Sequence, residues 1–311
     1  MRAFVFPGQG SQKVGMGVEL AEASPAAREV FEEVDDALGQ KLFAIMRDGP
    51  DESLTLTENA QPAIMANALA VLRVLEQEGH IALADKADFV AGHSLGEYTA
   101  LCAAGAFSLA DTARLLKLRG TAMQAAVPVG IGAMCVLLGA DIAKASALAD
   151  AAAEREICTV ANDNDPTQVV LSGHTGAIKR AIALAKDYGI KRGMALPVSA
   201  PFHCSLMQPA ADAMAEALER TQPQALRVAL FANVTASLVT DPAEVQRLLV
   251  EQVTGRVRWR ESVLAMADAG VENFVELGGK VLGPMISRTV EEVGVASVVS
   301  MADIEALARE F

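Results

Sequence analysis

Short apolar runs alternate along the chain with longer stretches whose apolar residues recur every three or four positions. The runs at residues 2–6 and 87–91 each lead into a glycine-containing turn, which predicts two short buried strands. The stretches at residues 59–78 and 108–126 have the length and composition of helices. Because strands alternate with helices, we predict one mostly parallel sheet covered by helices.

A second, smaller unit is predicted in the middle of the chain. Residues 127–130, with the sequence VPVG, break the preceding helical pattern. The elements that follow run strand, helix, strand, strand, helix, strand, an order typical of the ferredoxin-like arrangement. We therefore predict a small ferredoxin-like domain at residues 128–197 and a large α/β domain formed by residues 1–127 and 198–311.

The small domain is expected to have strands at 132–138, 157–161, 168–172 and 192–196 and helices at 141–153 and 175–188. Beyond it we expect strands at 228–232, 271–276 and 297–299 and helices near 207–220, 242–252, 259–269 and 301–311.

Composition and charge narrow the possible partners. A chain of 311 residues with a formal charge of −13 and only 4% aromatic residues is poorly suited to binding nucleic acid. The four cysteines form no CxxC pair, which suits reduced thiols. The first apolar run is too short for a signal peptide, and no apolar stretch is long enough to span a membrane. We expect a cytoplasmic protein without a metal or cofactor.

The sequence GHSLG at residues 92–96 lies between a predicted strand and a predicted helix. In that context the pattern GxSxG is typical of a nucleophile elbow, a sharp turn that exposes a serine at the carboxyl end of the sheet. It predicts Ser94 as a nucleophile and an α/β-hydrolase-like large domain. A Cβ at Gly92 or Gly96 would collide with a neighbouring element. The amide of Leu95 could stabilise an oxyanion. The alternative is an ordinary turn in which the serine caps a helix.

A nucleophilic serine at neutral pH needs a base, and the chain has four histidines. His93 is adjacent to Ser94 and would normally point elsewhere, so it is a structural neighbour or a residue of the substrate site rather than the base. His80 and His174 lie where a helix and a strand end. His203 lies in a proline-bounded loop outside the small domain, and elimination favours it as the base. A structural role for His203 stays open at this point.

Arg119 falls in the apolar stripe of the predicted helix at 108–126. Burying an unpaired guanidinium costs several kcal/mol, so Arg119 must meet an anion. That anion is either a carboxylate of the protein or the carboxylate of a ligand, bound by the two-pronged guanidinium. The residues alone leave both open.

Together these motifs closely resemble the malonyl-CoA:acyl-carrier-protein transacylases of type II fatty-acid synthesis. The resemblance spans essentially the whole chain. One departure is Phe202, where many members of that family carry a small polar residue, and it bears on acyl selectivity. The motifs that carry the resemblance are FPGQGSQ at 6–12, GHSLGEY at 92–98, LRG at 118–120, GAM at 132–134, AN at 161–162, QVVLSG at 168–173, PFHC at 201–204 and EQV at 251–253, followed by VRW at 257–259.

The resemblance implies a role for individual residues. Ser94 would be acylated and His203 would be its base. The backbone amides of Gln9 and Leu95 would bind the oxyanion, and the backbone carbonyl of Gln252 would orient the histidine in place of a triad acid. The implied substrate residues are Arg119, which would bind the free carboxylate of malonyl, and Asn162 and His93, which would border the same cleft.

The implied reaction is a ping-pong transfer of malonyl from malonyl-CoA to the phosphopantetheine thiol of an acyl carrier protein. We expect a monomer with these two partners and none among nucleic acids or membranes. Three alternatives stay open: a serine hydrolase, a transacylase of a polyketide pathway, and a non-catalytic protein that binds carrier proteins.

Overall fold

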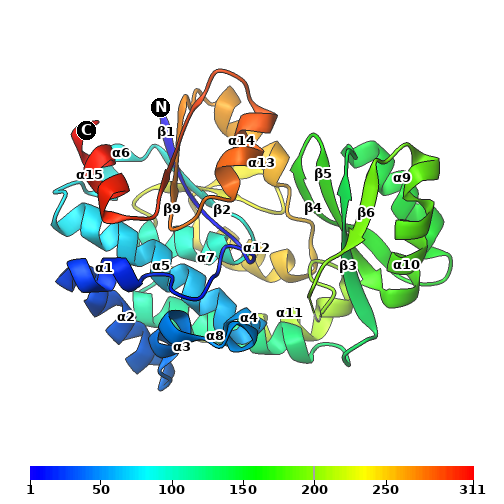
Figure 1. The fold of residues 1–311 in the computed structure, drawn as a ribbon, viewed down its shortest axis with the longest axis horizontal. Helices are drawn as coiled ribbons and strands as arrows, with labels where there is room; N and C mark the ends of the chain where they lie inside the picture. The colour runs from blue at the N-terminus through cyan, green and yellow to red at the C-terminus, as the bar shows by residue number, and fades with distance from the viewer. Residues whose placement is uncertain (199) are drawn as a thin grey trace.

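A computed structural model describes residues 1–198 and 200–311 (Figure 1). Its larger sheet has the strand order β10-β9-β1-β2-β7-β8. All neighbouring strands are parallel except β7 and β8, which form an antiparallel pair at one edge. The mostly parallel sheet expected from the sequence is therefore confirmed. Its strands are β1 (Arg2–Phe6), β2 (Phe89–Gly92), β7 (Ala229–Ala232), β8 (Ser237–Val239), β9 (Asn273–Leu277) and β10 (Gly294–Val298).

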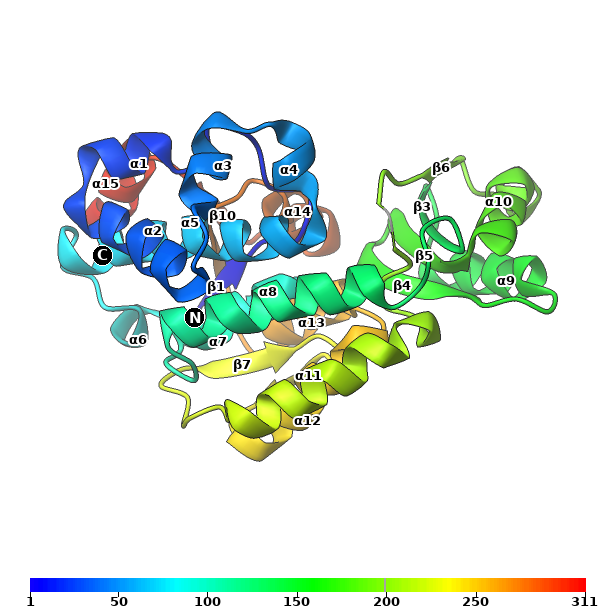
Figure 2. The same ribbon diagram turned by 90° about the horizontal axis from the view of Figure 1, so that it is seen from below.

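Helices bury both faces of this sheet. Phe4 and Phe6 of β1 face one apolar core, whereas Ala3 and Val5 face another, as the alternation of side chains along a strand requires. Figure 2 shows the helices on either side of the strands. The helices associated with this sheet are α1 (Val18–Ala23), α2 (Pro25–Leu38), α3 (Leu42–Asp48), α4 (Asp51–Thr55), α5 (Thr57–Gln77), α6 (Leu83–Lys86), α7 (Leu95–Ala103), α8 (Leu109–Ala125), α11 (Gln208–Arg220), α12 (Pro242–Thr254), α13 (Trp259–Asp268), α14 (Leu282–Thr289) and α15 (Met301–Arg309), with a short 3₁₀ turn, η2 (Ser205–Met207), before α11.

The second sheet is smaller, antiparallel throughout and ordered β4-β5-β3-β6. Its two helices cover one face, with a core of their own, and the unit projects from the side of the larger sheet (Figure 1). The strand, helix, strand, strand, helix, strand order predicted from the sequence is confirmed. The elements are β3 (Gly132–Leu138), α9 (Ile142–Ala153), β4 (Cys158–Asp165), β5 (Gln168–His174), α10 (Thr175–Leu184), η1 (Ala185–Tyr188) and β6 (Arg192–Ala195).

Strand β4 joins the two sheets. Its bulged second half forms a parallel bridge with Val257 from the loop before α13. Asp163 and Asp165, both fully buried, pair with Arg260 and Arg288 of the larger unit at 2.9 and 2.8 Å. These contacts fix the face of β4 that borders the cavity described below.

Several elements were not predicted. The helices over residues 18–55 and α14 were missed, as was the edge strand β8. The start of α2 had a readable signal, because Ser24 caps the helix and Pro25 occupies its first position. No helix in the described part of the chain is long and apolar enough to cross a membrane.

Candidate active site

Ser94 lies in a strained turn at the carboxyl end of β2. Its φ and ψ are 55° and −110°, in a region that non-glycine residues seldom adopt. The flanking glycines allow this turn. A Cβ at Gly92 would lie 1.9 Å from the carbonyl oxygen of Gly96, and one at Gly96 would lie 2.2 Å from that of Phe6. The predicted collisions are confirmed, and the geometry is that of a nucleophile elbow.

His203 is in contact with Ser94. Its Nε2 lies 2.8 Å from the Ser94 Oγ, and its Nδ1 lies 2.9 Å from the backbone oxygen of Gln252 and 3.1 Å from that of Gly255. Carbonyl oxygens only accept hydrogen bonds, so Nδ1 carries the proton and Nε2 is free to accept one from the serine.

The surroundings of His203 also keep it neutral. Burial lowers the pKa of the imidazole to about 3, and the nearby charge of Arg119 acts in the same direction. The residue itself has a φ of 58°, a second left-handed non-glycine position in the site. A neutral imidazole held in one tautomer is what a general base requires.

Arg119 is 1% exposed and reaches the same point from α8. Its Nη1 donates to Gln61 Oε1 at 2.8 Å, and its Nη2 donates to Gln252 Oε1 at 2.8 Å and to Ser94 Oγ at 3.1 Å. The guanidinium also lies over the ring of Tyr98, 5.6 Å from its centroid.

Within residues 1–198 and 200–311, no carboxylate forms an ion pair with Arg119, and its Nε has no hydrogen-bond partner. The structural ion pair considered above is therefore absent from the described part of the chain. The next residue, Gly120, allows α8 to pack closely against the start of α5, since a Cβ there would lie 2.6 Å from the carbonyl oxygen of Thr57.

A cavity of about 230 Å³ opens above Ser94. It brings together seven of the eight predicted site residues; only Gln252 lies behind the lining, where it contacts Arg119 and His203. The small sheet contributes Met134 and Asn162, so the cavity lies between the two sheets. Its lining is Gln9, Gly10, Gln12, Thr55, Gln61, His93, Ser94, Leu95, Arg119, Met123, Met134, Asn162, Leu196, Pro197, Val198, Phe202 and His203.

The two predicted residues on the small-sheet side of the site differ in their contacts. His93 Nε2 lies 2.9 Å from Asn164 Oδ1, and burial lowers the pKa of the imidazole. The ring therefore faces β4 and not Ser94, as its position next to the nucleophile predicts. Asn162 Oδ1 is buried without a partner among residues 1–198 and 200–311 and belongs to a residue that lines the cavity.

Three residues that contact this site were missed by the sequence analysis. Gln61 binds Arg119, and Asn233 Oδ1 accepts from the Ser94 amide at 2.8 Å. Glu97 is 1% exposed and binds the side chain of Gln252. Glu97 had a signal of the same kind as Arg119, a charged residue in the otherwise apolar run of α7. Gln61 and Asn233 had none, because only the fold brings them to the serine.

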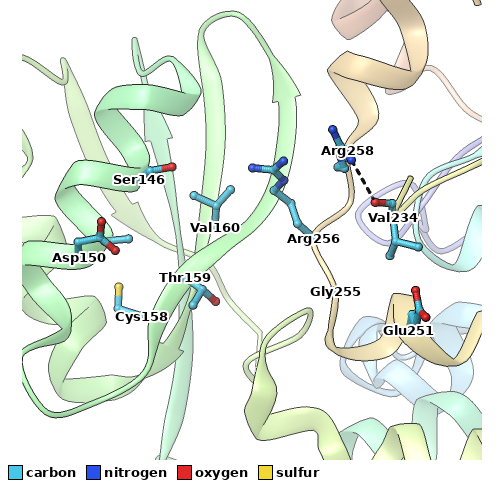
Figure 3. Close-up of a pocket in the computed structure, with 11 residues that line it drawn as sticks. Ser146, Asp150, Cys158, Thr159, Val160, Val234, Glu251, Gly255, Arg256 and Arg258 are labelled. Carbon is cyan, nitrogen blue, oxygen red and sulfur yellow. Dashed lines mark hydrogen bonds between the residues drawn. The ribbon is translucent and has the colours of Figure 1, made fainter. Parts of the chain in front are cut away.

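A larger cavity, of about 520 Å³, lies between α9, β4 and the loop at residues 255–258 (Figure 3). Burial raises the pKa of its one thiol, Cys158, to about 11, which makes that thiol a poor nucleophile. Its two arginines, Arg256 and Arg258, both donate to Glu261. Because this lining offers no activated nucleophile, we assign the chemistry to the cavity above Ser94.

Comparisons with known proteins agree with this geometry. The model of the acyl transferase domain matches residues 3–304. The malonyl CoA-acyl carrier protein transacylase of Escherichia coli is 44% identical to the chain, and the alignment covers 93% of each of the two proteins. That of Bacillus subtilis is 41% identical, and the alignment covers 97% of this chain and 95% of the relative.

Solved structures show the same relationship. An acyl-carrier-protein S-malonyltransferase from Bartonella henselae is 51% identical, with a TM-score of 0.97 over 99% of this chain and 98% of its own. A malonyl-transacylase solved in complex with a type II PKS acyl-carrier protein is 38% identical, with a TM-score of 0.96 over 100% and 99%. The chain belongs to the acyl transferase domain family and, within it, to the malonyl CoA-acyl carrier protein transacylases.

Proposed function

We propose that Ser94 and His203 transfer malonyl from malonyl-CoA to the phosphopantetheine thiol of an acyl carrier protein, a reaction that supplies fatty-acid chain elongation. The observation that carries this assignment is the convergence of three groups on one cavity: the Ser94 hydroxyl, a neutral imidazole 2.8 Å away and a buried guanidinium without a carboxylate partner in the described chain. The relationship to the malonyl CoA-acyl carrier protein transacylases supports the reaction, and the convergence on one cavity supports the proposed residues.

In the first half-reaction, Ser94 Oγ attacks the thioester carbon while His203 Nε2 takes the hydroxyl proton. The carbon–sulfur bond breaks, and the CoA sulfur leaves as a thiol with the proton from His203. In the second half-reaction, His203 takes the proton of the carrier's thiol, whose sulfur attacks the malonyl ester. Ser94 Oγ then leaves and recovers the proton. His203 returns to the same state after each half, so one base serves both thiols.

Two backbone amides, those of Gln9 and Leu95, are proposed to bind the oxyanion formed in each half-reaction. Both residues line the cavity next to Ser94. The Ser94 amide is not available for this purpose, because it donates to Asn233 Oδ1. Leu95 is the first residue of α7, where backbone amides lack partners within the helix.

Arg119 is proposed to select malonyl by pairing with its free carboxylate. The guanidinium already lies within 3.1 Å of the nucleophile, and its Nε has no hydrogen-bond partner in the part of the chain that the structure describes. An acetyl group would leave this buried charge without an anion, so the pairing favours malonyl. Asn162 and His93 are proposed to border the malonyl group on the side of β4.

The finer description of the fold is also proposed. The elbow between a parallel strand and a helix supports an α/β-hydrolase-like large domain of residues 1–127 and 198–311. The strand order β4-β5-β3-β6 with helices on one face supports a ferredoxin-like small domain of residues 128–197. A monomeric state, a cytoplasmic location and the absence of nucleic-acid partners stay predictions from the sequence.

Intact-protein mass spectrometry tests the function directly. After brief exposure to malonyl-CoA, the chain should gain the mass of one malonyl group, and Ser94→Ala should gain none. Adding a carrier protein bearing phosphopantetheine should remove the group from Ser94 and transfer it to the carrier. Loss of malonyl to water at the same rate with and without carrier would instead identify a hydrolase. A chain that is never acylated would contradict the assignment.

A further inference from the structure

Glu97 is a buried carboxylate next to the catalytic residues, and the reaction described above gives it no role. It lies on α7, three residues after Ser94, and is 1% exposed. Gln252 Nε2 donates to its Oε2 at 2.5 Å. The backbone nitrogen of Asn233 lies 3.4 Å from each of its two carboxyl oxygens. No lysine or arginine in the described part of the chain forms an ion pair with it. A carboxylate in such a place calls for an explanation, since burial is costly.

Gln252 connects Glu97 to the rest of the site. Its side-chain Oε1 accepts from Arg119 Nη2 at 2.8 Å, and its Nε2 also donates to the Ser94 backbone oxygen at 2.9 Å. Its own backbone oxygen accepts from His203 Nδ1. One residue therefore contacts the nucleophile, the base and the guanidinium.

These contacts depend on which way the Gln252 amide points. With Nε2 toward Glu97, the amide oxygen faces Arg119 and can accept from it. The reversed amide would place two N–H donors against a guanidinium, which has donors only. Glu97 Oε2 and the Ser94 backbone oxygen both accept from Nε2, and both therefore favour the first orientation; Glu97 is the one of the two whose side chain supplies the acceptor.

We propose that Glu97 is a positioning residue for malonyl transfer: its carboxyl oxygen fixes the Gln252 amide so that Arg119 is held where the free carboxylate of malonyl arrives. This inference rests on the proposed role of Arg119. Glu97 itself touches neither the substrate nor the reacting atoms; it acts through Gln252.

In the described part of the chain Glu97 receives hydrogen bonds from N–H donors and forms no ion pair, so an acceptor oxygen matters at this position more than a fixed charge. Burial raises the pKa of the Glu97 carboxyl to about 7, although Gln252, Asn233 and Arg119 act to lower it. The other titratable side chain beside it, Tyr98, is also buried, which raises the pKa of its phenol. We therefore expect an uncharged side chain of the same length, such as glutamine, to hold the Gln252 amide as glutamate does.

Three substitutions separate reach from charge. Glu97→Gln keeps an acceptor oxygen at the same distance and removes the charge. Glu97→Asp keeps the carboxylate but shortens the side chain by one methylene, so that its oxygens no longer reach Gln252. Glu97→Ala removes both the charge and the acceptor oxygens. Thr99→Val is the matched control, because Thr99 is buried on the same helix and no described residue forms a hydrogen bond with its hydroxyl. For each variant, kcat/KM for acylation of Ser94 is measured with malonyl-CoA and with acetyl-CoA, together with Tm.

The expected result is a selective loss. A displacement of about 1 Å in a substrate-binding group costs about 100-fold in rate, so Glu97→Ala and Glu97→Asp should lose about 10- to 100-fold in kcat/KM for malonyl-CoA. Acetyl-CoA, which has no free carboxylate for Arg119 to bind, should change by less than about 3-fold. Glu97→Gln should recover the malonyl-to-acetyl ratio to within about 3-fold of the original chain, and Thr99→Val should leave it unchanged.

Other outcomes would overturn the inference. If Glu97 had only a structural role, its substitution would lower kcat/KM for malonyl-CoA and for acetyl-CoA in parallel with Tm. The ratio of the two kcat/KM values would then stay unchanged. An aspartate variant that retains the ratio better than the glutamine variant would show that charge, not orientation, is needed. The order of these two variants decides the case even if the alanine variant fails to fold. Failure of the unsubstituted chain to acquire malonyl is a separate result, since it contradicts the proposed function itself.

Discussion

Replacing Arg119 with alanine tests the assignment of malonyl selectivity. The guanidinium is 1% exposed, and its pairing with a substrate carboxylate would take place away from water. Removing one partner of such a buried, hydrogen-bonded charge pair costs about 2–5 kcal/mol. At about 1.4 kcal/mol per tenfold change, kcat/KM for malonyl-CoA should fall by about 30- to 4,000-fold.

The same substitution should affect acetyl-CoA differently. Acetyl has no carboxylate, so the loss of the guanidinium removes no attraction and relieves a buried charge that acetyl leaves unpaired. Arg119 also donates to Ser94 Oγ at 3.1 Å, and losing that contact affects both substrates equally. The ratio of the two kcat/KM values therefore isolates the carboxylate contact, and it should fall by at least about tenfold.

The assay is the time course of Ser94 acylation, followed by intact mass for both thioesters. Arg114→Ala is the matched control, because Arg114 lies on the same helix, is 56% exposed and pairs with Asp111 at the surface. Removing Arg119 also leaves the oxygens of Gln61 and Gln252 without a donor, so Tm must be recorded for each variant. An unchanged malonyl-to-acetyl ratio in a folded Arg119→Ala variant would refute the reasoning.

Three further predictions concern pH and stability. Because burial lowers the pKa of His203 to about 3, the rate of Ser94 acylation should not fall with a midpoint near pH 6.5 when the pH is lowered from 8 to 5. A pH–rate profile with such a midpoint would show that His203 has the pKa of an ordinary imidazole. Burial raises the pKa of Glu97 from 4.5 to about 7, so the folded chain binds the extra proton between these values and loses stability as pH rises through them. Glu97→Gln lacks this loss, and its Tm relative to the original chain should be higher at pH 8 than at pH 5; a constant difference would contradict the shift. Arg260→Ala leaves the fully buried Asp163 unpaired and should lower the free energy of unfolding by about 3–5 kcal/mol. The control Arg220→Ala, which removes an exposed ion pair, should lower it by less than about 1 kcal/mol. Equal losses of the two variants in urea denaturation would show that the buried pair adds nothing to stability.

The parts of the site that the sequence predicts are those with a local signal. The elbow is readable because Gly92 and Gly96 flank Ser94 within five residues and a strand and a helix flank them. Arg119 is readable because a charge falls in an apolar stripe. Elimination among the four histidines favours His203, and the elbow indicates the amide of Leu95. The resemblance supplies Gln9, Asn162 and the carbonyl of Gln252.

The parts that could not be predicted depend on contacts between distant elements. The side chain of Gln252 meets Glu97 from 155 positions away, and Asn233 meets Ser94 from 139. No periodicity encodes such pairs, because three elements must first assemble. The edge strand β8 was missed for a related reason: it has three residues, two of them exposed, and only its pairing with β7 identifies it.

The use of carbonyl oxygens to orient His203 follows from what the cavity must hold. A carboxylate on Nδ1 would place a second anion close to Arg119 and compete with malonyl for the guanidinium. The oxygens of Gln252 and Gly255 fix the same tautomer without that charge. The acid that the site does contain, Glu97, contacts Arg119 only through the Gln252 amide, and burial favours its neutral form. The positive charge of Arg119 is thereby left for the substrate, which is the condition that selection of a dicarboxylic thioester requires.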